Sequence, residues 1–301
     1  MTTLIMSPSL PRFALIYFAS ALVALAQPAS STFRSSMLQS WSLGYSYSSQ
    51  SDLTRDGAAG AVAVNRLDFS YSGRLPLSPE SVMVYGFATT TNEFDTTPGT
   101  PLPERLAEVS LNLGLIKRYN PQWSVSLFAR PGFYGDFTDL GDSLNIPVLI
   151  LANYTQRKEL VWSFGLNINP ISEYPVLPVA GVRWQFAPAW TFNLGFPQAG
   201  LIYQQSPKAI WRAGLSFQGG SFRISENLGV PAPGVDRLAN TRLDYRETRF
   251  GVGADLTLPA GFILTLDAGM VGDRKFDYYD RDYILNGDPA AYGSIALRAA
   301  F

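Results

Sequence analysis

Apolar and polar residues alternate along much of the chain with a period of two. In the last ten residues, Ile295, Leu297 and Phe301 fall on one face of an extended segment, and Ser294 and Arg298 fall on the other. Successive side chains of a β-strand point to opposite faces, so this pattern predicts strands. Five further segments show the same apolar face: Leu67, Phe69 and Tyr71; Val109, Leu111, Leu113 and Leu115; Phe192, Leu194 and Phe196; Ala213, Leu215 and Phe217; and Phe250, Val252, Ala254, Leu256 and Leu258.

Charged residues fall on the opposite face of these and the other predicted strands. They are Arg66, Asp68, Glu108, Arg130, Arg183, Arg212, Arg223, Arg249, Asp255, Asp267 and Arg298. A shift of one residue in strand pairing would exchange the two faces. If the apolar face contacts lipid, that shift costs about 2–4 kcal/mol for each arginine near the middle of the bilayer. The pattern therefore places the apolar face toward lipid and these charges in the lumen.

Turn-forming residues divide the chain into short and long connections that alternate. The expected short turns are Pro76–Pro79, Asn120–Pro121, Thr155–Lys158, Ala187–Ala189, Gln218–Gly220 and Pro259–Gly261. The expected long connections are Ser48–Gly60, Thr90–Glu104, Pro131–Asn145, Asn169–Pro175, Pro197–Lys208, Asn227–Asn240 and Gly272–Pro289. This alternation is typical of an antiparallel up-and-down transmembrane β-barrel, in which one end has tight turns and the other has longer loops.

The connections predict an all-β fold, a single barrel over residues 39–301 with about fourteen strands at roughly ten residues per crossing. Twelve strands is the alternative, because Pro178 and Pro197 interrupt two of the segments and proline is disfavoured inside a sheet. Aromatic residues cluster near the expected short turns, as in the aromatic girdle of a barrel. A β-sandwich, the soluble alternative, gives no reason for that placement.

Both ends of the sequence suggest export. Arg12 is followed by an apolar run of about fourteen residues, shorter than the roughly 20 needed for a membrane-spanning helix, and Ala24-Leu25-Ala26 resembles a signal-peptidase site. We expect a signal peptide at residues 1–26, cleaved near Ala26, and a periplasmic lead segment at 27–38. The terminal strand that ends in Phe301 resembles the closing strand of bacterial outer-membrane β-barrels, whose assembly machinery reads that terminus as a signal.

A narrower resemblance covers roughly residues 146–225. The segments Leu177-Pro178-Val179-Ala180-Gly181-Val182-Arg183-Trp184, Leu194-Gly195-Phe196-Pro197 and Gly219-Gly220-Ser221-Phe222-Arg223 are similar to a bacterial outer-membrane family known as a domain of unknown function. This resemblance implies the barrel and the bacterial outer membrane as its location. It implies no catalytic or binding residue.

Composition narrows the chemistry. The chain has no cysteine and no histidine, which removes thiol nucleophiles, Ser-His-Asp triads and most zinc sites. The net charge of −1 gives no reason to expect a nucleic-acid partner. We therefore expect no enzymatic activity, no metal and no cofactor. The expected partners are outer-membrane lipid, the barrel-assembly machinery and small solutes.

Arginines outnumber carboxylates in the predicted lumen, which favours a porin-like channel for small solutes with a preference for anions. Two alternatives stay open. In the first, ion pairs such as Arg66 with Asp68 fill a closed barrel, and the long loops contact a partner. In the second, the barrel transports a hydrophobic solute, although related fourteen-stranded carriers use an N-terminal hatch and few residues precede Trp41 to form one.

Overall fold

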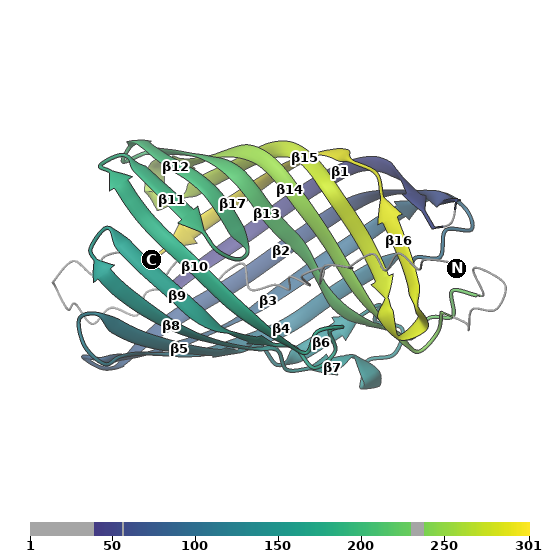
Figure 1. Ribbon diagram of the computed structural model, residues 1–301, viewed down its shortest axis with the longest axis horizontal. Helices are drawn as coiled ribbons and strands as arrows, with labels where there is room; N and C mark the ends of the chain where they lie inside the picture. The colour runs from purple at the N-terminus through teal and green to yellow at the C-terminus, as the bar shows by residue number, and fades with distance from the viewer. Residues whose placement is uncertain (1–38, 56, 230–237) are drawn as a thin grey trace, which may run out of the picture.

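The computed structural model describes residues 39–55, 57–229 and 238–301, so the expected signal peptide and lead segment lie outside the described residues. A single 17-stranded sheet closes on itself (Figure 1). Its strands are β1 (Gln39–Thr54), β2 (Ala58–Ser78), β3 (Ser81–Thr96), β4 (Arg105–Arg118), β5 (Trp123–Ala129), β6 (Gly132–Gly135), β7 (Leu144–Asn145), β8 (Val148–Arg157), β9 (Leu160–Ile168), β10 (Val176–Ala187), β11 (Trp190–Leu194), β12 (Gln198–Ser206), β13 (Ala209–Ile224), β14 (Thr241–Thr257), β15 (Ile263–Tyr278), β16 (Tyr283–Gly287) and β17 (Ala290–Ala300). Short 3₁₀ turns lie at η2 (Gly141–Ser143), η3 (Pro259–Gly261) and η4 (Tyr279–Arg281).

The barrel has 14 strand positions, because β6 and β7 extend their neighbours in the wall and β16 extends β17. β1 closes the ring by pairing with β17, from Ser40 opposite Ala300 to Ser48 opposite Tyr292. The predicted all-β barrel of fourteen strands is confirmed. No helix in the described part of the chain is long and apolar enough to cross a membrane.

Side-chain exposure follows the predicted alternation. On β4, Val109, Leu111, Leu113 and Leu115 are exposed on the outer surface, whereas Ser110 is buried inside. On β14, Phe250 and Val252 are exposed in the same way. The outer surface is therefore an apolar belt, as a lipid-facing wall requires.

Five of the six predicted short turns are confirmed, and Gln218–Gly220 is wrong. That segment continues β13, whereas the turn lies between β12 and β13, at the end of the connection predicted for Pro197–Lys208. Two adjacent glycines usually indicate a turn. Here Gly219 has a φ of 125°, and a Cβ at this position would collide with the carbonyl oxygen of Tyr245. The glycine thus lets β13 approach β14 closely without breaking the strand.

Neither proline removes a strand. Pro178 lies in β10, in a stretch that pairs with β9 alone, so its missing N–H leaves no vacant place in a ladder on the other edge. Pro197 lies at the tip of the hairpin between β11 and β12. Pro178 therefore lies on a part of β10 that pairs along one edge only, and Pro197 lies in the connection between β11 and β12.

A packed apolar core fills the end of the barrel that carries the long loops. Its sixteen buried members come from β1–β4, β6, β13–β16 and the segments beside them: Leu53, Val62, Val64, Phe94, Leu102, Leu106, Tyr134, Phe222, Ile224, Leu238, Leu243, Tyr245, Phe276, Tyr278, Tyr283 and Leu285. At its centre the Phe276 ring stacks on Tyr245 at 4.9 Å, and Phe94 meets both edge-on at 5.4 Å. In outer-membrane barrels this end is extracellular. The described residues thus close the extracellular end of the lumen.

The ring narrows at this level. Gly135 of β6 pairs with Arg223 of β13 in parallel, so β6 and β13 become neighbours and β7 to β12 are excluded from the ring. Asp136 extends the contact, because its Oδ2 accepts hydrogen bonds of 2.8 Å from the backbone N–H groups of Ser225 and Glu226. The barrel is therefore wide at the turn end and narrow at the loop end.

Candidate functional site: the lumenal cavity

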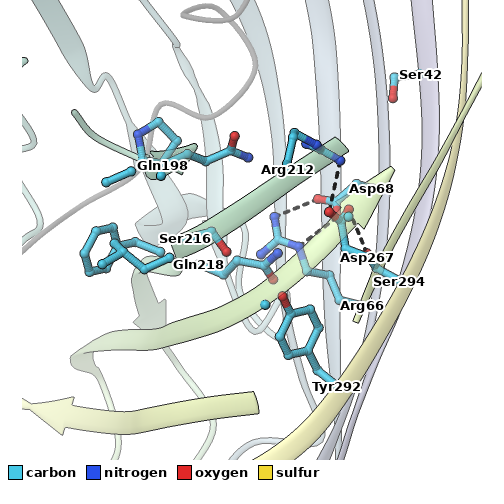
Figure 2. A pocket seen from close by; sticks show the side chains of 18 of the residues that line it. Ser42, Arg66, Asp68, Gln198, Arg212, Ser216, Gln218, Asp267, Tyr292 and Ser294 are labelled. Carbon is cyan, nitrogen blue, oxygen red and sulfur yellow. Dashed lines mark hydrogen bonds and ion pairs between the residues drawn. The ribbon is translucent and has the colours of Figure 1, made fainter. Parts of the chain in front are cut away.

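Below the extracellular core, the lumen holds a cavity of about 270 Å³. Side chains from opposite walls converge on it (Figure 2): Arg66 and Asp68 from β2, Ser216 and Gln218 from β13, and Tyr292 from β17. Six of the predicted lumenal charges line it, namely Arg66, Asp68, Glu108, Arg130, Arg212 and Asp267.

The charges on the β2–β4 wall are paired. Arg66 Nη2 lies 2.7 Å from Asp68 Oδ1, and the same oxygen accepts a 2.7 Å hydrogen bond from the hydroxyl of Thr90. On β4, Glu108 forms an ion pair with Arg130, which follows β5. Arg66 and Arg130, the cavity arginines of this wall, therefore each have a carboxylate beside them.

A second set of ion pairs lies on the facing wall. Arg212 Nη2 is 3.0 Å from Asp267 Oδ1 and 3.4 Å from Asp255 Oδ1, and Arg298 is 3.2 Å from Asp255 Oδ2. Two arginines and two carboxylates thus form one neutral network. These ion pairs agree with the alternative in which charges fill and stiffen a closed barrel. The predicted anion preference depended on an excess of arginine, whereas three arginines and three carboxylates line the cavity.

A buried network of charges lies between the cavity and the extracellular core. Glu247 accepts hydrogen bonds of 2.8 Å from Arg249 Nε and from Arg274 Nε, and all three side chains are at most 2% exposed. Arg274 also donates to Ser51 Oγ at 2.8 Å. Of these residues, only Arg249 was predicted in the lumen. Arg274 was assigned to a loop, because the ladder of β15 continues further than its charged sequence suggests.

Four predicted lumenal arginines do not line the cavity: Arg249 and Arg298, which belong to the networks described above, and Arg183 and Arg223. Arg183 is opposite Asn193 of β11 and is not among the residues that line the cavity. Arg223 occupies the face of β13 opposite to the buried Phe222 and is 3.8 Å from Asp142 at the extracellular end. For Arg223 the physical reason is again Gly219-Gly220, because β13 continues past the expected turn and up to the loop end.

A row of glycines forms part of the cavity wall, and the sequence analysis did not find it. Gly200, Gly214, Gly251 and Gly269 are opposite one another on four successive strands, and the first three line the cavity. A Cβ on Gly251 would collide with the hydroxyl of Tyr292. Three positions of the cavity wall therefore carry no side chain, which leaves room in the lumen. Comparing glycine positions between predicted strand partners could have shown the row.

A connection outside the cavity ties the β9–β10 hairpin to β14. In the segment Asn169–Pro175, Ser172 Oγ and the Glu173 backbone N–H donate hydrogen bonds of 3.2 and 3.1 Å to Asp244 Oδ2. Burial raises the pKa of Asp244 to about 6, although its hydrogen bonds partly oppose the shift and the charge of Glu173 adds to it. We call this segment the strap.

The comparisons now identify the family. A sequence model described as "Domain of unknown function (DUF6268)" matches residues 81–284. The chain belongs to this family. No curated protein matches the sequence. The predicted resemblance to an uncharacterised outer-membrane barrel family is confirmed.

Among solved structures, the DUF6268 chain resembles one described as "TodX deltaS2S3 mutant monoaromatic hydrocarbon channel", with a TM-score of 0.55, 11% identity and 96% of each chain covered. Similar but weaker matches are an outer membrane channel from Pseudomonas putida F1 (TM-score 0.48, 11% identity, 87% of this chain and 95% of that one) and a Pseudomonas aeruginosa FadL homologue (TM-score 0.45, 10% identity, 88% and 90%). At this identity the first match establishes a shared fold, that of a bacterial outer-membrane barrel.

Proposed function

We propose that the DUF6268 protein is an outer-membrane channel for small solutes of mainly apolar character. The observation that carries the proposal is the combination of a sealed extracellular end with a cavity below it. A water-filled porin needs an aqueous path along the barrel axis. The sixteen-member core occupies that path in the described residues, and it argues against the porin-like interpretation.

The alternative of a hydrophobic-solute transporter gains support for two reasons. The TodX variant of the same fold is described as a monoaromatic hydrocarbon channel. In the described residues, the strands themselves supply a seal at the extracellular end. A cavity of about 270 Å³ is close to the lower end of the usual range for ligand pockets, so the solute is small.

The lining combines three ion pairs with a few neutral polar groups. Ser42, Ser216, Gln218 and Tyr292 offer hydroxyl and amide groups, and the neighbouring charges neutralise one another in pairs. A few polar groups in a cavity fix the orientation of a ligand. The site therefore suits a solute with a compact apolar body and one or two hydrogen-bonding groups.

Uptake by intact cells tests the proposal. A Gram-negative host expressing the chain should take up radiolabelled toluene faster than the same host with an empty vector. Ser216→Trp, which fills the cavity, should lower the rate toward that of the vector. Leu111→Trp, on the outer face of β4 and away from the cavity, should keep the wild-type rate. Purified protein in planar bilayers should show no stable ion conductance in potassium chloride. Uptake equal to the vector, or a steady porin-like conductance, would contradict the proposal.

A further inference from the structure

The two ends of the barrel carry exposed charges of opposite sign. In the described residues, the exposed charged side chains of the extracellular connections are seven carboxylates: Glu104, Asp139, Asp142, Glu226, Asp280, Asp282 and Asp288. At the other end, five cations and two carboxylates are exposed in the tight turns and the two adjoining residues of each strand: Lys117, Arg118, Arg157, Lys158 and Lys208, with Glu80 and Glu159. The whole chain has a net charge of −1, so the charges are segregated along the barrel axis.

Lys117 continues the lipid-facing row of β4. Alternate residues from Val109 to Leu115 are exposed on this strand, and Lys117 is the next exposed position of the same alternation. Its ammonium nitrogen lies 5.2 Å from the centroid of the Tyr119 ring. A lysine on a lipid-facing surface extends its charge past the apolar region to the headgroups. Lys117 is therefore a cation at the boundary between acyl chains and headgroups.

Three more cations lie near Lys117 and form with it what we call the basic patch. Its members are Lys117, Arg118, Arg157 and Lys158. The first two end β4, and the last two lie at the turn between β8 and β9. Strand β5 pairs with β4 on one edge and with β8 on the other, so the two turns are neighbours at this end of the barrel (Figure 1). The Thr155 N–H donates a 2.8 Å hydrogen bond to the Gln122 carbonyl oxygen, which joins the turns directly.

The basic patch has no ion pair within the described part of the chain, and all four of its side chains are exposed. The arginines that line the cavity differ, because each of them lies beside a carboxylate. Unpaired cations that share one surface create a positive potential, which attracts anionic lipid headgroups. The charge of the patch therefore indicates a partner that carries phosphate.

Aromatic side chains lie on the membrane side of the basic patch. Trp123 of β5 packs on Tyr154 of β8, with the ring centroids 4.8 Å apart. On β9, the indole N–H of Trp162 donates a 3.1 Å hydrogen bond to Gln156 Oε1. Tryptophan and tyrosine on a barrel surface lie at the level of the lipid headgroups, and the tight turns of such a barrel are periplasmic. The basic patch is therefore at headgroup depth in the periplasmic leaflet.

We propose that the basic patch binds the headgroup of an anionic phospholipid in the periplasmic leaflet of the outer membrane. An acyl chain of this lipid lies along the apolar row that ends at Leu115, and Lys117 contacts the phosphate at the edge of that row. The two turns supply the remaining positive charge. An acidic polymer in the periplasm fits less well, because Lys117 belongs to the lipid-facing row. The proposal concerns the outer surface and does not depend on the solute that the lumen carries.

Quenching by lipids with brominated chains tests the proposal. The chain has no native cysteine, so Leu115→Cys can be labelled alone with bimane. Leu43→Cys, exposed on β1 near the same end and away from the patch, provides the control label. Each protein is reconstituted into phosphatidylcholine vesicles that contain the same minor fraction of brominated phosphatidylglycerol or brominated phosphatidylethanolamine. We expect phosphatidylglycerol to be enriched at Leu115 by about fivefold or more, the gain from one basic residue at an anionic headgroup, and not at Leu43. Equal quenching by the two lipids at Leu115 would overturn the proposal.

A matched pair of charge variants separates a local site from the general charge of this end. Lys117→Gln should lower the phosphatidylglycerol enrichment at the Leu115 label by about fivefold. Lys208→Gln removes the same charge at the turn between β12 and β13 and should leave the enrichment unchanged. Both replace exposed side chains, and migration as a heat-modifiable band checks that each variant assembles. An equal loss in the two variants would contradict a lipid site at the patch. Cosedimentation with purified peptidoglycan that Lys158→Gln abolishes, without any lipid preference at Leu115, would assign the patch to the cell wall and overturn the proposal.

Discussion

Glu247 is the residue whose replacement most directly tests the buried charge network. Its carboxylate is fully buried and holds Arg249 and Arg274 at 2.7–2.8 Å. At an effective dielectric constant of 20, each contact amounts to about 6 kcal/mol of gross attraction, most of which offsets the cost of burying the charges. Glu247→Gln removes the negative charge and leaves two buried guanidinium groups. Breaking a buried pair in this way costs about 3–5 kcal/mol.

Equilibrium unfolding in guanidinium chloride, with the barrel refolded into detergent micelles, measures this loss. We expect the free energy of unfolding of Glu247→Gln to fall by about 3–5 kcal/mol. Glu93→Gln is the matched control, because Glu93 is exposed on β3 and should change stability by no more than about 0.5 kcal/mol. If Glu247→Gln unfolds within 1 kcal/mol of the wild type, Ser46 and Ser48 or trapped water already satisfy the arginines, and the network is not the stabilising element described.

Three further outcomes are expected. Phe276→Ala should destabilise the barrel by about 3–5 kcal/mol in the same assay, because the ring is fully buried in the extracellular core, whereas Phe87→Ala on the outer face should cost less. Phe301→Ala keeps both 2.9 Å backbone hydrogen bonds to Gln39 and removes a ring that is already exposed, so the free energy of unfolding should not change. The yield of assembled, heat-modifiable protein should fall, because the terminal aromatic residue acts as an assembly signal. A wild-type yield would contradict that role. Burial raises the pKa of Asp244 to about 6, so the strap is most stable when this carboxyl is protonated, and that stability is lost as pH rises through about 6. Protection of the Glu173 amide from hydrogen exchange should therefore fall between about pH 4 and pH 7 relative to Asp244→Asn, and parallel profiles would refute this reasoning.

The sequence predicts the barrel because its signals are local. Alternation in segments such as Val109–Leu115 fixes which face meets lipid, and turn residues such as those at Asn120-Pro121 fix where strands reverse. The turn predicted from Gly219-Gly220 was wrong, because these glycines allow close contact between β13 and β14 within a continuous strand. Local pattern cannot separate these two uses of glycine, because the deciding contact lies 26 residues away at Tyr245.

The sequence predicted the charged residues of the cavity better than it predicted the contacts among them. Inward charges such as Arg66 and Asp68 follow from register alone, and six of them do line the cavity. Their partners were harder to assign, because Arg212 meets Asp267 across 55 residues of sequence. The extracellular core depends on the β6–β13 contact, which joins segments about ninety positions apart and has no sequence signal of its own.

The barrel is packed at its extracellular end and hollow below it, so the two ends should tolerate sequence changes differently. The aromatic residues around Phe276 pack together at one end, and the short β11–β12 hairpin contributes no described residue to that core. Insertions, deletions and changes of side-chain size at that hairpin therefore act on a part of the wall that contributes little to global cohesion. Changes at a few residues around Pro197, which lines the cavity, therefore alter the cavity wall, while the packed core preserves the fold.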